Sequence, residues 1–328
     1  MTATALDTQG ETLEVDIRSP RQEAWRRFKK DRFAVFFLWV FGLFALLALG
    51  AQVIEVIQAP DFVYKQTLKD QGLDFEETAL PPTSEHWLAW WGTTSAGKSV
   101  LLRVFHGTKV AFVVGACGAL FSVLIGMTLG LMAGFLGRIA DEIVVYLYST
   151  VASIPYLLLM LALAFIVRQG PIAEFYRDSL LDEYVSIGLF NITLVVGLTS
   201  WVTLCRLVRA EVKKVKELDY VQAARSLGFG NWRIMFKHVL PNVFHLVIIN
   251  FSLTFVLAIK SEVILTFLGV GVEKEPSWGQ MISDAKSELM KGIWWPLAFS
   301  GGFLFLLTLA VNYVGDALRD ALDPKLRS

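Results

Sequence analysis

Long apolar segments alternate with shorter polar ones along most of this chain. A helix needs about 20 mainly apolar residues to cross a bilayer, because it rises about 1.5 Å per residue. Six segments approach or exceed that length, at about residues 33–54, 109–135, 143–167, 185–205, 243–259 and 293–314. The stretch Val263 to Val270 is too short to cross, so it is either an extension of the fifth span or a re-entrant segment. The pattern predicts an all-α integral membrane protein with about six transmembrane helices.

Composition supports membrane residence. The 328 residues are 55% hydrophobic and only 18% charged, which is rare for a soluble domain of this size. The formal net charge of zero argues against nucleic acid as a partner. Cys117 and Cys205 fall in or at the end of apolar segments, which favours small packing residues over a disulfide or a metal site. No metal-binding spacing and no nucleophile–base pair is visible, so we expect no metal, no catalytic residue and no enzyme activity.

The polar segments define the sides of the membrane. Residues 1–32 are too long a polar leader for a signal peptide, so we expect a retained first span at 33–54 behind an N-terminal tail. Within that tail, Leu13 to Phe28 forms either a surface helix against the membrane or a solvated tail. Residues 55–108 are expected outside the cell, where their acidic bias fits, with acids at Glu55, Asp61, Asp70, Asp74, Glu76, Glu77 and Glu85.

A basic loop at residues 206–241 separates two of the spans. Its eight positive residues are Arg206, Arg209, Lys213, Lys214, Lys216, Arg225, Arg233 and Lys237, against the acids Glu211, Glu217 and Asp219. Positive excess between spans marks a cytoplasmic loop. Six spans then place this loop, the N-terminal tail and the C-terminal tail at 315–328 together in the cytoplasm.

The residues of the same loop predict a helix, a turn and a second helix. Gly228 can adopt the left-handed conformation that ends a helix without a Cβ penalty. A second helical run, Asn231 to Val239, begins with a good N-cap residue and is expected to stop before Pro241. The small side chains of Ala223 and Ala224 would let a partner approach closely.

Residues Gly92 to Ser99 formally match the phosphate-binding pattern G-x-x-x-x-G-K-[ST]. That chemistry requires a preceding buried strand and a following helix in an α/β core. Here an aromatic run typical of a membrane interface precedes the motif and a span follows it, on the outer side of the membrane. We therefore expect a structured turn and no nucleotide.

Inside the spans, three features are expected to matter. Glycines in the second span permit close helix contacts, and they are Gly115, Gly118, Gly126, Gly130 and Gly134. Pro155 predicts a kink in the third span. Lys260 and Glu262, near the outer end of the fifth span, either line a translocation pathway or act as interfacial anchors.

Four motifs in order resemble those of one membrane-protein family. The spacing Q-A-A-x3-G-x9-H-x-L-P, from Gln222 to Pro241, resembles the "EAA" coupling motif of membrane subunits of bacterial ABC importers, with Gln222 where Glu is usual. The segment from Gly92 resembles a "GTDxxGRDVLSR" signature, with Thr94 in place of Asp and Lys98-Ser99 in place of Arg-Asp. The stretches Pro276 to Gly279 and Gly315 to Pro324 resemble "PSWG" and "GDxLRDxLDP". Together they resemble the C-type permease subunit of the oligopeptide/dipeptide/nickel ABC importers, from about residue 20 onward.

The resemblance implies a type I ABC importer permease fold, with a permease core at 109–314 and a cytoplasmic coupling helix. It implies four kinds of partner: a homologous B-type permease, two cytoplasmic ATPase subunits that bind ATP and Mg, an extracytoplasmic binding protein and membrane lipid. It also implies a multi-pass bacterial inner-membrane location, a di- or oligopeptide cargo and no cofactor in this chain. The implied ATPase-coupling residues are Tyr220, Val221, Gln222, Ala223, Ala224, Arg225, Ser226, Leu227, Gly228, Leu240 and Pro241.

Two other classes of function remain as alternatives. A secondary transporter or channel that works without an ATPase would be expected to have inverted repeats with paired helix interruptions, and none is visible in the sequence. A membrane-bound ATPase built on Gly92 to Ser99 would need that loop in the cytoplasm, where the predicted topology does not place it.

Overall fold

The computed structural model describes residues 2–6, 12–16, 20–57, 67–70, 79–179 and 185–322. The chain is nearly all helical, so the predicted fold class is confirmed. Within the described ranges, five helices are long and apolar enough to cross a membrane, or six if one bent pair counts as a single span. Parts of the expected outer region, 58–66 and 71–78, with Asp61, Asp74, Glu76 and Glu77, lie outside the described residues, as does 323–328 of the expected tail.

The candidate spans are longer than the sequence pattern predicts. They are α2 (Arg32–Ile57), α3 (Val100–Leu136), the bent pair α4 (Arg138–Ser153) and α5 (Tyr156–Gln169), α8 (Ile187–Val215), α11 (Leu240–Phe267) and α13 (Trp295–Leu322). The shorter elements are α1 (Pro20–Lys30), η1 (Trp87–Ala89), α6 (Pro171–Arg177), α9 (Asp219–Ser226), α10 (Asn231–Ile234), a π-helical turn η2 (Met235–Val239) and α12 (Trp278–Leu289). An N-terminal hairpin pairs β1 (Thr2–Leu6) with β2 (Thr12–Asp16).

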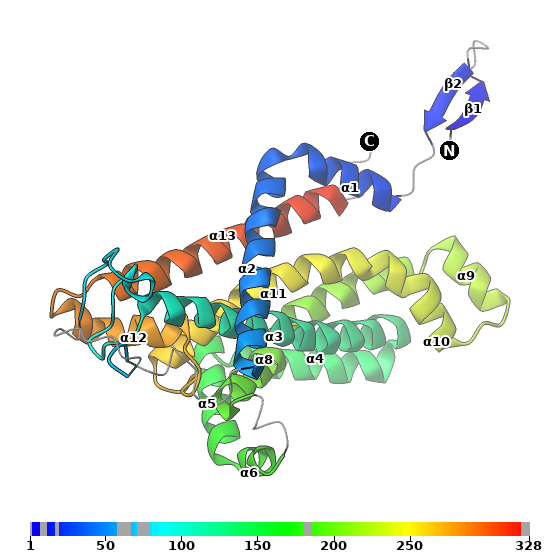
Figure 1. Ribbon diagram of the computed structural model, residues 1–328. Helices are drawn as coiled ribbons and strands as arrows, with labels where there is room; N and C mark the ends of the chain where they lie inside the picture. The colour runs from blue at the N-terminus through cyan, green and yellow to red at the C-terminus, as the bar shows by residue number, and fades with distance from the viewer. Residues whose placement is uncertain are drawn as a thin grey trace.

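The hairpin and α1 correct the expectation for the N-terminal tail. A single helix over Leu13 to Phe28 is not present, because β2 ends at Asp16 and α1 begins at Pro20. Proline is favoured in the first turn of a helix, since its missing N–H would have no partner there. Phe28 of α1 is buried against Ala34 and Ala321, so α1 packs beside the end of α13 (Figure 1).

Helices α3, α8 and α11 run side by side, with α9 and α10 at one end of the bundle and α12 at the other (Figure 1). Close contact of α3 with α8 depends on glycine, as predicted. A Cβ at Gly126 would lie 2.7 Å from the carbonyl oxygen of Trp201, and one at Gly130 would lie 2.8 Å from that of Cys205. Cys205 itself is fully buried, which confirms its packing role, whereas Cys117 is exposed.

Two span boundaries differ from those that the sequence pattern predicts. The second span was predicted from Lys109, but α3 begins nine residues earlier, after Ser99 accepts a hydrogen bond from the main-chain N–H of Leu102. Lys109 is compatible with a buried helix because Glu55 of α2 pairs with it. Of the stretch Val263 to Val270, the part up to Phe267 extends the fifth span, and a turn follows in which Gly269 takes a positive φ of 81°.

At Pro155 the structure has a break and not a mild kink. Helices α4 and α5 meet at 96°. Ile154 takes an extended conformation, with φ −93° and ψ 132°. The ring of a following proline disfavours the helical region at the preceding residue, so the break falls where the sequence placed it and is much sharper than expected.

Candidate functional site

The segment α9–η2 forms a helix, a turn and a second helix at one end of the bundle (Figure 1). The turn is a Schellman motif, in which Phe229 N–H donates to the Ala224 carbonyl at 3.2 Å and Gly228 N–H donates to the Arg225 carbonyl at 3.0 Å. Gly228 has a φ of 79°, as the sequence predicted. These two bonds satisfy carbonyls that the end of α9 would leave without partners, so the turn is locally determined.

The second helix does not stop before Pro241, which corrects the prediction. From Asn231 the chain runs through the π-helical turn η2 directly into α11, so α10, η2 and the fifth span form one continuous helix. Pro241 lies in the first turn of α11, where the wider π-turn accommodates its missing N–H. Helix α10 starts after Gly230 and has no side-chain cap, so the expected capping by Asn231 is also absent.

One face of α9 packs into the bundle. Val221 is fully buried and Ala224 nearly so, in a cluster that also contains Phe135 of α3 and Val212 of α8. Ala223 is exposed. The expected continuous Ala223–Ala224 surface is therefore divided, because neighbouring helical residues point about 100° apart.

Several exposed side chains of this segment are apolar, although exposed charged residues lie between them in the sequence. We call the apolar set the end surface, and it consists of Leu218, Tyr220, Ala223, Leu227, Trp232 and Phe236. Leu227 is 73% exposed and Trp232 61% exposed, and the Trp232 and Phe236 rings stack with centroids 5.9 Å apart. Partial burial raises the pKa of the Tyr220 hydroxyl above its ordinary value. Exposed aromatic and aliphatic side chains grouped in this way are typical of a protein-binding site.

Gln222 faces neither the core nor open solvent. Its side-chain N–H donates to the Lys216 carbonyl at 3.0 Å and to Glu217 Oε2 at 3.4 Å. This bond ties the first half of α9 to the end of the preceding helix. A glutamate cannot donate, so the amide has a structural role here that the sequence did not disclose.

An ion cluster that the sequence pattern did not reveal lies near the same end of the bundle. Asp141 of α4 accepts from Arg209 Nη2 at 2.9 Å and from Lys213 Nζ at 2.8 Å, both on α8. Asp141 lies 68 and 72 residues before Arg209 and Lys213, and only the antiparallel return of α8 beside α4 brings it to them. They tie the loop between α3 and α4 to the helix that leads into the basic loop.

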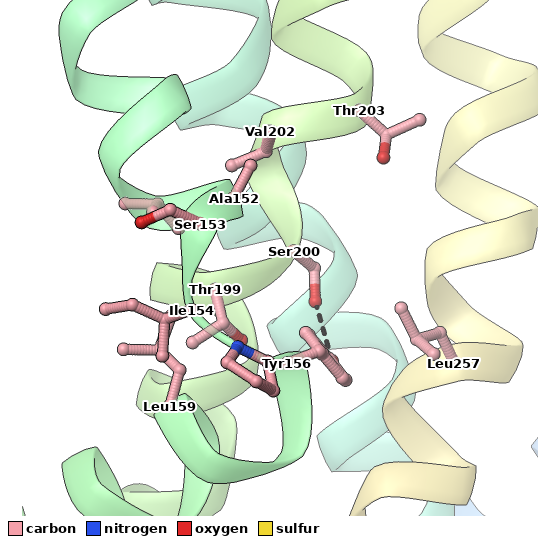
Figure 2. Close-up of a pocket in the computed structure, with 12 residues that line it drawn as sticks. Ala152, Ser153, Ile154, Tyr156, Leu159, Thr199, Ser200, Val202, Thr203 and Leu257 are labelled. Atoms are coloured by element: carbon pink, nitrogen blue, oxygen red, sulfur yellow. Dashed lines mark hydrogen bonds between the residues drawn. The ribbon is translucent and has the colours of Figure 1, made fainter.

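A cavity of about 450 Å³ lies at the α4–α5 break (Figure 2). Its lining combines the break residues with side chains of α8 and α11, namely Val151, Ala152, Ser153, Ile154, Pro155, Tyr156, Leu159, Thr199, Ser200, Val202, Thr203 and Leu257. None of these twelve residues is charged, and five carry a hydroxyl. The Tyr156 hydroxyl lies 3.2 Å from Ser200 Oγ and 3.3 Å from Ser261 Oγ.

Lys260 and Glu262 do not belong to this cavity. Lys260 is exposed on α11, whereas Glu262 is buried and accepts a hydrogen bond from Thr266 at 2.9 Å. A Cβ added to Gly279 of α12 would lie 3.3 Å from Glu262 Oε1, so the carboxylate faces the junction of α11 with α12. The two candidates are therefore not brought together.

The loop Gly92 to Ser99 is a closed turn, as expected. Thr94 N–H donates to the Lys98 carbonyl, and Gly97 N–H donates to the Thr94 carbonyl. A 3₁₀ turn precedes it and α3 follows it, so the strand that a phosphate loop requires is not there. Among the residues that the structure describes, no three potential metal ligands come together either.

Comparisons with known proteins agree with this architecture. Residues 126–328 match the family described as "Binding-protein-dependent transport system inner membrane component", and residues 19–82 match "N-terminal TM domain of oligopeptide transport permease C". The chain is 36% identical over 308 residues to the dipeptide transport system permease protein DppC of Bacillus subtilis (strain 168), covering 93% of this chain and 86% of that protein.

Two further relatives and one solved structure extend the comparison. The chain is 32% identical over 317 residues to the glutathione transport system permease protein GsiD of Pectobacterium atrosepticum, covering 95% and 93% of the two chains. It is 31% identical over 307 residues to the oligopeptide transport system permease protein OppC of Bacillus subtilis, covering 93% and 90%. The structure of the inward-facing MetNI methionine ABC transporter matches with a TM-score of 0.51 and 17% identity over 68% of this chain and 96% of that one, which is a likeness of fold.

Proposed function

Because the chain belongs to the family of binding-protein-dependent transport system inner membrane components, as a C-type peptide permease, we propose that it forms half of an ATP-driven peptide importer. The other half is a homologous B-type permease. Two cytoplasmic ATPase subunits bind ATP and Mg and drive the cycle, and an extracytoplasmic binding protein delivers the peptide. This chain supplies no cofactor and no catalytic residue.

The end surface carries the proposal. Apolar side chains exposed to water are costly unless a partner covers them, and these lie on a short segment that protrudes from the bundle. The segment is also rigidly connected to the bundle. Val221 and Ala224 pack into the bundle on its inner face, and its second helix continues without a break into α11. A displacement of the end surface by a bound partner would therefore be transmitted directly to α8 and α11.

Charge gives the proposed orientation. The excess of positive residues at 206–241 supports a cytoplasmic position for the end surface, with the N-terminal tail at 1–32 and the C-terminal tail at 315–328 proposed on the same side. The region 55–108 then lies outside. The coupling set from Tyr220 to Gly228, with Leu240 and Pro241, would contact the ATPase through its exposed members, while Val221 and Ala224 support them from within.

For Lys260 and Glu262 we propose different roles. Exposed Lys260 suits an anchor whose long stem lies along the span while the ammonium group reaches the interface. Glu262 suits a brace between α11 and α12, since its carboxylate already accepts from Thr266. Neither role requires contact with the cargo.

The rival function is a secondary transporter or channel that works without an ATPase. Such proteins place ion sites at paired helix interruptions. In the described part of the chain one bent pair of helices stands out, and the cavity at its break has no charged lining residue. The end surface would then have no partner.

The test is a mild-detergent pull-down of the tagged chain from its native membrane, with identification of the proteins recovered. We expect a second permease and ATPase subunits, and loss of the ATPases with Leu227→Glu or Ala223→Trp. Met290→Glu is the matched control, because Met290 is 91% exposed and directly follows α12, which lies at the opposite end of the bundle from α9. A chain that comes down alone and transports without ATP would contradict the proposal.

A further inference from the structure

The cavity at the α4–α5 break lies inside the membrane. Ser200 follows Ile187, the start of α8, by 13 residues and precedes Arg206, the first charged residue of that helix, by six. At about 1.5 Å per residue these steps are roughly 20 Å and 9 Å along the helix. Ser153 follows Glu142, the last charged residue of α4, by eleven residues, or about 16 Å. Both walls of the cavity are thus at membrane depth.

Lipid cannot be what covers this face. Ile154 and Pro155 are irregular backbone and exposed, and Ser153 at the end of α4 and Thr203 nearby are exposed too. A helix end leaves carbonyl and N–H groups without partners, and hydrocarbon offers none. Irregular backbone at membrane depth is tolerated only where it is covered by protein or lines a water-filled space. The break therefore faces the interior of the assembled transporter.

The lining has a distinctive chemistry. Its hydroxyls can donate or accept hydrogen bonds, and its other side chains are aliphatic. In Figure 2, Ser200 and Thr203 extend from α8, and the Tyr156 hydroxyl is linked to Ser200. No lining residue is Asp, Glu, Lys, Arg, His or Cys, so the site offers neither a counter-charge nor ligands for a metal ion.

We propose that this cavity is a transit site for the peptide main chain. Every peptide unit presents a donor and an acceptor, whatever its side chain, and hydroxyls satisfy both. An uncharged lining gives no Coulomb preference between acidic and basic side chains. The volume falls within the roughly 300–1,000 Å³ of small-ligand sites. The site thus accepts peptides by their backbone and is indifferent to their charge. This inference rests on the proposed importer function and adds to it where the cargo binds and by which groups.

The first test introduces a charge at Thr203 in the complete importer, reconstituted in proteoliposomes with its partner subunits and binding protein. Uptake of an acidic, a neutral and a basic peptide of equal length is compared. Thr203→Lys should lower the basic-to-acidic uptake ratio by at least about tenfold, and Thr203→Asp should raise it by a similar factor, because an adjacent charge acts strongly at low dielectric. Thr150→Lys, at an exposed threonine of α4 outside the lining, should leave the ratio unchanged.

The controls separate two kinds of failure. ATP hydrolysis stimulated by the loaded binding protein is measured in the same proteoliposomes. If wild-type hydrolysis shows no stimulation, the importer function itself fails. If stimulation is normal and both charged variants keep the wild-type ratio, the importer stands and the transit site is overturned.

A second test covers the case in which a charged variant does not assemble. Ser200→Cys is made in a Cys117→Ala background, while buried Cys205 is kept. A water-soluble thiol reagent should modify Ser200→Cys, and excess peptide during ATP turnover should slow that reaction. Leu43→Cys, exposed on α2 within the membrane, should stay unmodified. An unreactive Ser200→Cys, or one that peptide does not protect, overturns the proposal.

Discussion

Ser95 and Glu288, 193 residues apart in the chain, are joined by two hydrogen bonds to one carboxylate oxygen. The Ser95 N–H lies 3.0 Å and its hydroxyl 3.2 Å from Glu288 Oε1. Glu288 is 2% exposed, and its Oε2 has no hydrogen-bond partner within the described ranges. Ser95 belongs to the loop that formally matches a phosphate-binding motif, so the anion beside that loop is a carboxylate of the same chain.

The unpaired oxygen predicts an unequal response to two substitutions at Glu288. Glu288→Leu leaves Ser95 without its acceptor and should lower the free energy of unfolding by about 1–3 kcal/mol. Glu288→Gln keeps an acceptor for Ser95 and removes a buried charge, so its stability should equal or exceed that of the wild type. Thermal unfolding in detergent measures both, and equal losses for the two variants would contradict the assignment.

The closed turn from Gly92 to Ser99 predicts that replacing Lys98 leaves transport unchanged. In a phosphate loop the lysine holds the β- and γ-phosphates, so its loss would abolish nucleotide binding. Here the Lys98 N–H is bonded to Thr94 Oγ1 within a closed turn. We expect Lys98→Ala to leave ATP-driven uptake unchanged in proteoliposomes. A fall in nucleotide affinity of the complex would restore the ATPase alternative for this chain.

Gly228 and Gly230 make a matched pair for testing the end surface. A Cβ at either glycine meets nothing within 4 Å, but Gly228 has a φ of 79° and Gly230 a φ of −66°. Gly228→Val should therefore cost about 2 kcal/mol of backbone strain and reduce the population of the native turn up to about thirtyfold. ATPase stimulation and uptake should fall together in Gly228→Val and remain near wild type in Gly230→Val. Equal activity of the two variants would exclude a coupling role for this turn.

Gln222 predicts an order of local stability. Gln222→Met loses the bond to the Lys216 carbonyl, worth about 1 kcal/mol. Gln222→Glu loses it too and adds repulsion with Glu217. Hydrogen exchange of the α9 amides should be slowest in the wild type, faster in Gln222→Met and fastest in Gln222→Glu. If Gln222→Glu exchanged as slowly as the wild type, the amide would have no structural role.

The contact of Glu55 with His106 and Lys109 predicts a strong coupling between α2 and α3. Lys109 is buried, so Glu55→Gln leaves a cation without its partner and should destabilise the protein by up to about 3–5 kcal/mol. The double variant Glu55→Gln with Lys109→Met removes both charges and should recover most of that loss. Thermal unfolding of the two single variants and the double variant gives the coupling free energy, and additive losses would contradict the pairing.

Much of this protein follows from local properties of its sequence. Apolar length determines where spans lie, because a helix must cross about 30 Å of hydrocarbon. The positive excess at 206–241 indicates a cytoplasmic loop without reference to any contact. The turn at Gly228 was predictable because only glycine takes a positive φ without strain, and the site of the α4–α5 break was predictable because proline restricts the residue before it.

What the sequence left open was decided by contacts between distant residues. Glu55 allows Lys109 to lie inside α3, and Val212 and Phe135 determine that Ala224 faces inward while Ala223 stays exposed. The cavity exists only because α8 and α11 bring Ser200 and Leu257 beside the broken helix. Hydrophobic periodicity and turn chemistry act over a few residues, so they determine where helices begin, bend and turn. Burial, ion pairing and cavities arise from packing between helices, and only the tertiary structure decides them.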